Sequence, residues 1–182
     1  SFMDEHIYLN EEAYAHQLKT AENRFAPLPL MDELKLKAKE AGLWNLFVPE
    51  EHAEYCDHGG LSFFDYAPLA EMMGRVIWCP EVFNCNAPDT GNMEVFMNYA
   101  TEAQQREWLD PLLAGDIRSS YAMTEPQVAS SDATNVELRI EKAGNEWVLN
   151  GHKWFISNAM YERTKILICL LYTSDAADES VC

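Results

Sequence analysis

The stretch YAMTEPQVASSDATN, residues 121–135, separates two patterns of apolar residues in the chain. Before it, apolar side chains recur three or four positions apart, which is typical of amphipathic helices. After it, they alternate with polar side chains, which is typical of strands that face a core on one side. The sequence therefore predicts an α+β fold, in which an N-terminal all-α helical bundle precedes an antiparallel β region, with the boundary near Arg118.

The helical part carries recognisable start and stop signals. Pro29 suits the first turn of a helix, and Gly42 suits the left-handed residue just past its end. Ser62 and Asp65 have the spacing of an N-terminal cap, and the helix that they open is expected to run to Pro80.

Two further helices are expected before the β region. Asp89 is the predicted N-cap of the first, while Thr101 and Gln104 form a capping box for the second, which ends at Gly115. A helix over residues 4–22 is also expected. The predicted buried faces consist of Leu30, Leu34, Ala38, Ala41, Tyr66, Leu69, Ala70, Met73, Ile77, Met93, Phe96, Met97, Tyr99, Trp108, Leu109 and Leu112.

The β region begins with two alternating segments, VELRIE (136–141) and EWVLN (146–150). Asn150-Gly151 is a strong turn signal for a hairpin into HKWFIS, and KILICLL (165–171) has the composition of a fully buried strand. An antiparallel meander is therefore expected. Its few strands leave edges without partners, so this second domain is expected to be truncated.

Composition excludes several classes of function. The net charge of −17, from 13 basic and 30 acidic residues, argues against sequence-independent nucleic-acid binding and against an anionic membrane surface. No apolar run is long enough to span a bilayer, and the acidic N-terminus does not resemble a signal peptide. Five cysteines without a CxxC spacing indicate free thiols in a reducing compartment.

The last segment, residues 169–182, loses the periodicity of the chain before it. The string CLLYTSDAADE, from Cys169, resembles the in-frame translation of a transposon-end adapter used for sequencing libraries. We therefore predict that this tail is not native, the alternative being a natural strand followed by a polar loop. Such an origin favours a bacterial cytoplasm, with the mitochondrion or peroxisome as the eukaryotic alternatives.

One short cluster, EEHAEYCDHGG, has the residue types of a metal site. His52, Cys56 and His58 are spaced like ligands, but a structural zinc site normally brings two separated pairs, so an exposed loop is the favoured interpretation. We find no Ser or Cys in a recognisable nucleophile elbow. The methionine-rich segment 93–97 is expected to be core rather than the lining of an apolar tunnel.

The stretch 121–135 has the residues of a cofactor site. Pro126 removes a ladder donor, so the polar groups around Met123 and Thr124 can point away from the sheet. Turn-forming residues after it expose N–H groups that can hold an anion without lysine. The residues predicted to form this anion site are Ser130, Ser131, Asp132, Thr134 and Asn135.

A second segment, NGHKWFISN, adds an aromatic wall at Phe155, next to Ile156 and Ser157. A planar cofactor that bears a pyrophosphate needs donors for its ring, an aromatic wall and an anion site. The residues alone leave two interpretations open: such a cofactor site, or a hydroxyl-rich strand, a loop and an ordinary hairpin.

These two segments, YAMTEP with SSD and the later NGHKWFISN, resemble the flavin-binding signature of acyl-CoA dehydrogenases. The likeness extends over residues 20–168, where GLWNLFVPEEH, YAPLAEMMGR and PEVFNCNAPDTGNMEVF resemble the branch that in animals is fused to a kinase-like domain. It implies a helical domain at residues 1–117 and the truncated start of an antiparallel β-barrel domain at 118–168. A C-terminal four-helix bundle would complete the protein.

The resemblance implies FAD as cofactor and assigns contacts to it. Tyr121, Met123 and Thr124 would contact the isoalloxazine ring, Ser130 or Ser131 the pyrophosphate or the acyl-CoA, and Phe155, Ile156 and Ser157 would flank the ring. TEPQVASSD is one residue longer than the family's common TEPGAGSD, which leaves the choice between the two serines open. Phe155 replaces a common tryptophan and keeps the aromatic wall.

The implied reaction is α,β-dehydrogenation of acyl-CoA thioesters to 2-enoyl-CoA. Its catalytic base is a Glu of the C-terminal bundle, so no catalytic residue is assigned here and the fragment is expected to be inactive alone. An electron-transferring flavoprotein is the implied acceptor, and a homodimer or homotetramer the implied assembly. The alternatives are an acyl-CoA oxidase that uses oxygen and, if the chain ends at Cys182, a non-enzymatic helical interaction module.

Overall fold

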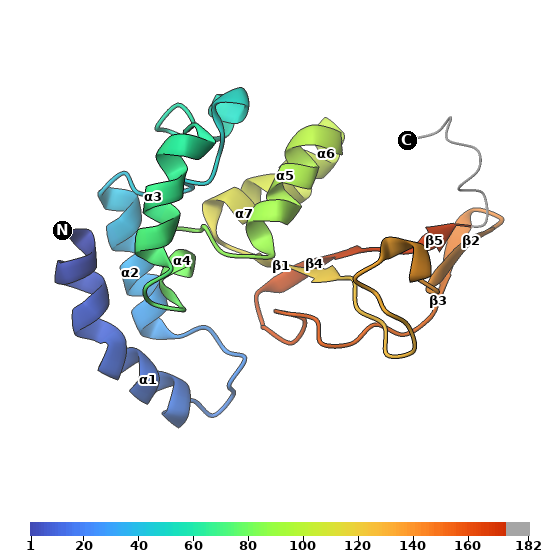
Figure 1. Ribbon diagram of the computed structural model, residues 1–182, viewed down its shortest axis with the longest axis horizontal. Helices are drawn as coiled ribbons and strands as arrows, with labels where there is room; N and C mark the ends of the chain where they lie inside the picture. Colours follow the sequence, from blue (N-terminus) through green and yellow to red (C-terminus); the bar gives the residue numbers. More distant parts are fainter. Residues whose placement is uncertain (174–182) are drawn as a thin grey trace.

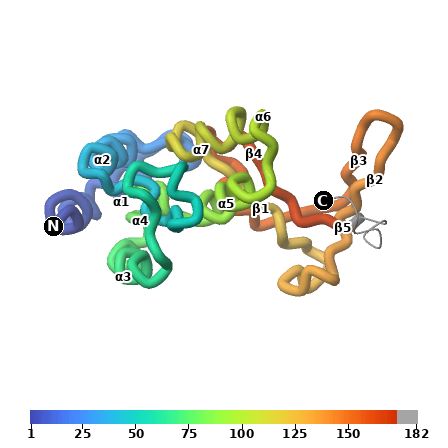
Figure 2. The backbone as a smooth tube through the Cα atoms, turned by 90° about the horizontal axis from the view of Figure 1, so that it is seen from above, coloured from blue at the N-terminus to red at the C-terminus, as the bar shows by residue number. Residues whose placement is uncertain are grey.

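The computed structural model describes residues 1–173 and consists of a helical part followed by a smaller β part. Figure 1 shows the helices at one end of the molecule, with β1 (Arg118–Ala122) and β4 (Thr164–Cys169) next to α5 (Asp89–Tyr99) and α7 (Asp110–Ala114), and β2, β3 and β5 farther away. In the perpendicular view the hairpin of β2 and β3 projects away from the rest of the molecule (Figure 2). The expected α+β class and the order of its two parts are confirmed.

The regular elements are short and follow one another closely. The helices are α1 (Glu11–Thr20), α2 (Pro29–Glu40), α3 (Phe63–Met73), α4 (Cys79–Val82), α5 (Asp89–Tyr99), α6 (Glu102–Gln104) and α7 (Asp110–Ala114). Single π or 3-10 turns occupy Met3–Ile7, Tyr8–Asn10, Glu50–Tyr55, Gln105–Leu109 and Ala133–Asn135. No helix among residues 1–173 is long and apolar enough to cross a membrane.

For the helix predicted from Ser62 to Pro80, the N-terminal cap is confirmed but the predicted end is wrong. The Ser62 hydroxyl accepts a hydrogen bond from the Asp65 N–H at 3.1 Å and so caps α3. The helix ends at Met73, however, and does not reach Pro80. The intervening turns point Val76 into the core, whereas Ile77, predicted to be buried, is 96% exposed.

The other caps are confirmed with one exception. Gly42 and Gly115 have left-handed φ angles of 69° and 76°, and Thr101 forms its capping box with Gln104. Asp89 is the exception, because it is the first residue of α5 and its carboxylate does not cap the helix. It is turned instead toward Arg118 of β1.

Two apolar clusters form the core. The first packs the N-terminal turns against α2, α3 and α4, and includes the fully buried Ile7 and Leu34. The second packs α5 and α7 against β4, and includes Met93 together with Phe96 and Met97, as predicted. Of the remaining predicted core residues, Ala41 is exposed because it caps α2, and Tyr99 is 83% exposed because it lies about 120° from the Met93 face of α5.

The strands form two small sheets. β1 (Arg118–Ala122) pairs in parallel with β4 (Thr164–Cys169). β2 (Arg139–Ala143) pairs antiparallel with β3 (Glu146–Asn150), which confirms the first predicted hairpin, and β5 (Tyr172–Thr173) adds to β2 in parallel.

The predicted meander is wrong beyond this hairpin. Residues 151–163 form turns rather than a strand, so Asn150-Gly151 does not open a second hairpin. The physical reason is that the N–H of Trp154 bonds to Thr124 and the ammonium of Lys153 bonds to Glu125, which draws this segment away from β3. β4 is also only half-buried, because the second cluster covers one of its faces.

Candidate functional site

The two segments singled out in the sequence lie against each other. The Lys153 ammonium donates to the carbonyl of Met123 and to a carboxylate oxygen of Glu125, both at 2.8 Å. The next residue, Trp154, donates its N–H to the carbonyl of Thr124 at 3.0 Å. The segment just after β1 and the turn that begins at Gly151 are thus joined at the point where the predicted flavin contacts cluster.

Glu125 is the centre of this junction. Its side chain is 3% exposed and accepts hydrogen bonds from Lys153 and from the N–H groups of Glu137 and Leu138, at 2.8 and 2.9 Å. Burial alone would raise the pKa of Glu125, but these hydrogen bonds outweigh it and lower the pKa below its ordinary value. Glu125 and Lys153 were not among the residues predicted for the site, although they belong to the TEP and NGxK motifs.

The loop after Glu125 distinguishes the two candidate serines. Ser130 is buried, and its hydroxyl accepts the Glu125 N–H at 2.7 Å, so its described contacts hold the turn together. Ser131 is exposed. Asp132 accepts both the N–H and the hydroxyl of Thr134, at 3.0 and 2.6 Å, and these bonds lower the pKa of Asp132. Of the two candidate serines, Ser131 is therefore the one that is exposed.

The predicted ring contacts lie on both sides of the junction. Tyr121 and Thr124 are exposed on the β1 side, and Met123 is half-buried. On the other side Phe155 is 82% exposed, with a left-handed φ of 52° and its ring 4.5 Å from that of Trp154. Ile156 is half-buried and Ser157 exposed. A left-handed φ is costly for an aromatic residue and here turns the side chain outward.

A buried charge cluster attaches β1 to the helices. Arg118 pairs with Asp89 and with Glu81, whose carboxylate also accepts Lys35 at 2.8 Å. The Asp89 carboxylate also accepts the N–H and hydroxyl of Ser119, at 2.7 and 2.5 Å. Burial alone would lower the pKa of Arg118, but the two carboxylates outweigh it and raise that pKa. Two cations and two anions therefore hold α2, α4 and α5 to the strand that carries Tyr121.

The turn after Phe155 is attached to the helices as well. Arg163 forms a bidentate pair with Asp32 of α2, with both N–O distances at 2.6 Å. Glu162 accepts a hydrogen bond from the side chain of Asn23 at 2.6 Å. Asn158 donates to the carbonyl of Ser119 at 3.1 Å, which connects this turn back to β1.

His52, Cys56 and His58 lie in the helical part, in and just after the turn Glu50–Tyr55. Within residues 1–173 no group of three or more His, Cys, Asp or Glu side chains is arranged to hold a metal ion. Cys56 and His58 contact each other, with Sγ 3.7 Å from Nδ1.

The chain thus combines a helical domain with a smaller β domain, and the two segments of the candidate site lie just after β1 and in the turn before β4. A family model described as the acyl-CoA dehydrogenase N-terminal domain matches residues 2–116, and the model of the acyl-CoA dehydrogenase middle domain matches residues 120–181. The chain belongs to the acyl-CoA dehydrogenase family, as the sequence signature predicted.

Relatives with this family's name occur in animals and bacteria. The chain is 47% identical over 178 residues to acyl-CoA dehydrogenase family member 10 of Mus musculus, covering 97% of this chain and 16% of that protein. It is 48% identical over 180 residues to the acyl-CoA dehydrogenase relative FadE2 of Mycobacterium tuberculosis, covering 97% and 42%. The chain thus spans less than half the length of these relatives.

Solved structures show the same fold. A structure from Mycobacterium abscessus assigned to the acyl-CoA dehydrogenases matches with a TM-score of 0.88 and 45% identity, over 98% of this chain and 45% of that one. A glutaryl-CoA dehydrogenase from Mycobacterium smegmatis in complex with FADH2 matches with a TM-score of 0.60 and 22% identity, over 96% and 40%, which shows a shared fold.

Proposed function

We propose that this chain supplies the helical domain and part of the flavin site of an FAD-dependent enzyme that dehydrogenates acyl-CoA thioesters to 2-enoyl-CoA. The observation that carries the proposal is the junction formed by Lys153. Its two hydrogen bonds hold the TEP and NGxK segments together, and Thr124 and Phe155 on these two segments are exposed.

The residues at the junction fit a flavin. The exposed hydroxyl of Thr124 can donate to a ring nitrogen or carbonyl, and Phe155 offers an exposed aromatic face. Residues 121–135 contain no Lys or Arg, so the exposed hydroxyl of Ser131 and backbone N–H groups would hold a pyrophosphate. Tyr121, Met123, Ile156 and Ser157 complete the proposed set of ring contacts, and Ser130 supports the loop from within. When bound, FAD supplies the acceptor for the hydride that leaves the β carbon.

The side chains of this chain position the two segments of the site and do not themselves react with the substrate. Glu125 and Lys153 are positioning residues, because they set the spacing of the two segments through backbone contacts. We assign no catalytic base to these 182 positions and place it in the additional length that the relatives have. We further propose an acyl-CoA substrate, a homodimer or homotetramer, and an electron-transferring flavoprotein as acceptor.

A chimera tests the proposal. Residues 1–168 replace the matching region of the M. tuberculosis relative, and the purified protein is mixed with acyl-CoA without oxygen. We expect bound flavin whose visible absorbance is lost on addition of substrate. A folded chimera without flavin, or with flavin that acyl-CoA does not reduce, would contradict the proposal. Peroxide formation in air without an added acceptor would instead identify an oxidase.

A matched pair of variants tests the junction itself. Thr124→Val removes the exposed hydroxyl and preserves shape, so the affinity for FAD is expected to fall about tenfold, the worth of one hydrogen bond. Thr20→Val, at the exposed end of α1, removes a hydroxyl that bonds only within its helix and is expected to leave FAD affinity unchanged.

A further inference from the structure

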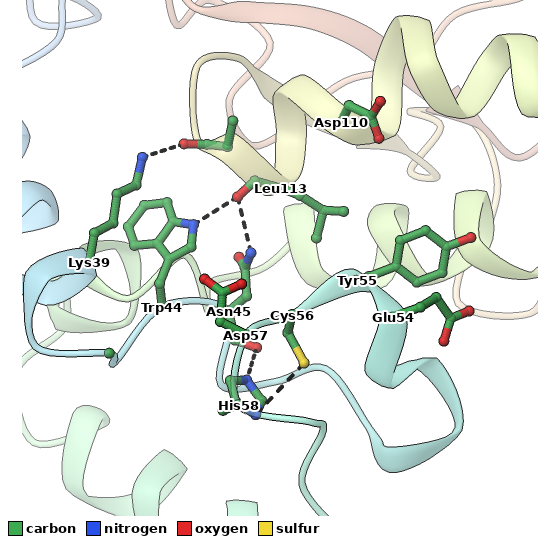
Figure 3. Close-up of a pocket in the computed structure, with 12 residues that line it drawn as sticks. Lys39, Trp44, Asn45, Glu54, Tyr55, Cys56, Asp57, His58, Asp110 and Leu113 are labelled. Carbon is green, nitrogen blue, oxygen red and sulfur yellow. Dashed lines mark hydrogen bonds between the residues drawn. The ribbon is translucent and has the colours of Figure 1, made fainter.

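A cavity of about 520 Å³ lies between the loop after α2, the turn Glu50–Tyr55 and α7, apart from the junction of the two flavin segments (Figure 3). One wall is fixed by the indole N–H of Trp44 and the side chain of Asn45, which both donate to the carbonyl of Leu113, at 2.7 and 3.0 Å. The proposed function does not use this cavity. The thiol of Cys56 and the imidazole of His58 both line it.

Cys56 and His58 have the geometry of a nucleophile with its base. Nε2 of His58 lies 3.1 Å from the carbonyl oxygen of Asn45, an acceptor, so Nε2 carries the proton and Nδ1 is left with its lone pair. That lone pair faces the Cys56 sulfur at 3.7 Å, the same distance that separates this sulfur from the carbonyl oxygen of Ala53. The Gly60 N–H donates to the sulfur at 3.2 Å. The base accepts the thiol proton, and the amide stabilises the thiolate that results.

The other described thiols are placed differently. Cys79 and Cys85 are buried in the first apolar cluster, where burial raises the pKa of Cys79 to about 12 and that of Cys85 to about 11. Burial also raises the pKa of the half-buried Cys169. Cys56 and His58 do not belong to a nucleophile-elbow motif in the sequence. They come into contact because the chain turns just after Glu50–Tyr55.

The charged side chains that line the cavity favour a ligand of one charge over the other. Glu54, Asp57 and Asp110 line it. Lys39, the cation of the lining, donates to the carbonyl of Ala114 at 2.6 Å and lies 4.4 Å from the Trp44 ring centre. Three carboxylates against one engaged ammonium favour a cationic small molecule over an anionic one.

We propose that Cys56 is a modification site at which the thiol, activated by His58, exchanges with small cationic disulfides. The Cys56 proton passes to Nδ1 of His58, and the thiolate attacks one sulfur of the disulfide. A new S–S bond to Cys56 forms as the old S–S bond breaks, and the departing thiolate takes up a proton. The disulfide is the oxidant, so one thiol is consumed and one thiol is released.

The test compares two disulfides of opposite charge on the unmodified chain. Cystamine is cationic and dithiodiglycolate is anionic, and mass spectrometry with peptide mapping follows the rate at which each adds to Cys56. A synthetic peptide with the sequence of residues 50–60 gives the rates for the same thiol without the fold. We expect the folded chain to react faster than the peptide with cystamine, and to prefer cystamine over dithiodiglycolate about tenfold more strongly than the peptide does.

A variant isolates the base. His58→Gln keeps a donor for the Asn45 carbonyl but cannot take the thiol proton. Without this base, the rate with cystamine is expected to fall to that of the peptide. The Cys56→Ser chain should gain no mass on this peptide. Equal rates for chain and peptide, or the same preference between the two disulfides in both, would overturn the proposal even if His58→Gln did not fold.

Discussion

The helical part and the β part of this chain are held together by different forces. In the helical part, side chains such as Leu34, Val82 and Leu109 are completely buried in apolar clusters. In the β part, every residue of β3 is exposed, and Trp147 and Leu149 are 60% and 55% exposed. Hydrophobic burial therefore stabilises the helices, whereas the strands and turns of the candidate site depend on ion pairs and hydrogen bonds.

This difference has consequences for mutation. An apolar core loses stability in proportion to the atoms removed, since the loss combines transfer free energy with a cavity. A buried ion pair responds to the loss of a single partner, since the remaining charge is left without compensation in a poorly solvated place. The attachment of the candidate site to the helices should accordingly be more sensitive to single charge removals than to changes in its exposed apolar residues.

The largest effect is expected from Arg118→Met. This change leaves the buried carboxylates of Asp89 and Glu81 without their shared partner, so the free energy of unfolding should fall by about 3–5 kcal/mol. Urea unfolding followed by circular dichroism measures it. Arg139→Met on the exposed strand β2 is the matched control and should change stability by less than about 0.5 kcal/mol. If the two variants lost similar free energies of unfolding, the buried ion pairs would not be what attaches the β part to the helices.

The next largest effect is expected from Leu34→Ala in α2. Leu34 is 0% exposed, so the cavity should cost about 3 kcal/mol, within the range measured for such changes. Leu36→Ala on the same helix is the control, because Leu36 is 61% exposed and its truncation should be nearly neutral. A core that tolerates Leu34→Ala as well as Leu36→Ala is not the apolar core described above.

A smaller effect is expected from Gly115→Ala at the hinge between α7 and β1. Gly115 has a left-handed φ of 76°, and a Cβ there would lie 2.6 Å from the ring of Trp44. Strain and the displaced indole should together cost about 1–2 kcal/mol. Gly91→Ala in α5, where a Cβ would meet nothing within 4 Å, should instead stabilise the protein by up to about 1 kcal/mol. The two changes should therefore shift the thermal midpoint in opposite directions.

Acid should loosen the β part before the helical part. Burial would raise the pKa of Glu125, but Lys153 and the N–H groups of Glu137 and Leu138 outweigh it and lower that pKa. A carboxylate with a lowered pKa in the folded state contributes stability above its unfolded pKa, near 4.3, and this contribution is lost as the pH falls through the folded value. Hydrogen exchange corrected for intrinsic rates should therefore rise first in residues 121–158 below about pH 4. If protection from exchange were lost in α2 at a higher pH than in residues 121–158, the helical part would be the more acid-sensitive part, which contradicts this prediction.

Sequence signals predicted the features that depend on near neighbours. The Ser62 cap, the Thr101–Gln104 box and the turn at Gly115 are confirmed because each is made by residues at most four positions apart. The flavin-signature segments were located for a similar reason, since their letters are contiguous.

Features that depend on distant partners were not predictable in the same way. The Asn150-Gly151 turn signal was overridden by contacts of Lys153 with residues 28 and 30 positions earlier in the chain. The parallel pairing of β1 with β4 leaves no mark on the alternation of either strand. Asp89 has the sequence context of a cap, yet Arg118 offers its carboxylate a buried cationic partner. The motif marked the segment of the candidate site, but only the fold showed that Ser130 is buried and Ser131 exposed.

The most direct test of the central claim is hydrogen exchange of the chimera with and without FAD. The account predicts that FAD slows exchange in residues 121–135 and 153–158, because these segments form the proposed flavin site. Exchange in α2 and α5 should stay the same, because the apolar core stabilises them without the cofactor. Slowing that is confined to the helices, or no slowing in either segment, would contradict the assignment of the flavin site to the Lys153 junction.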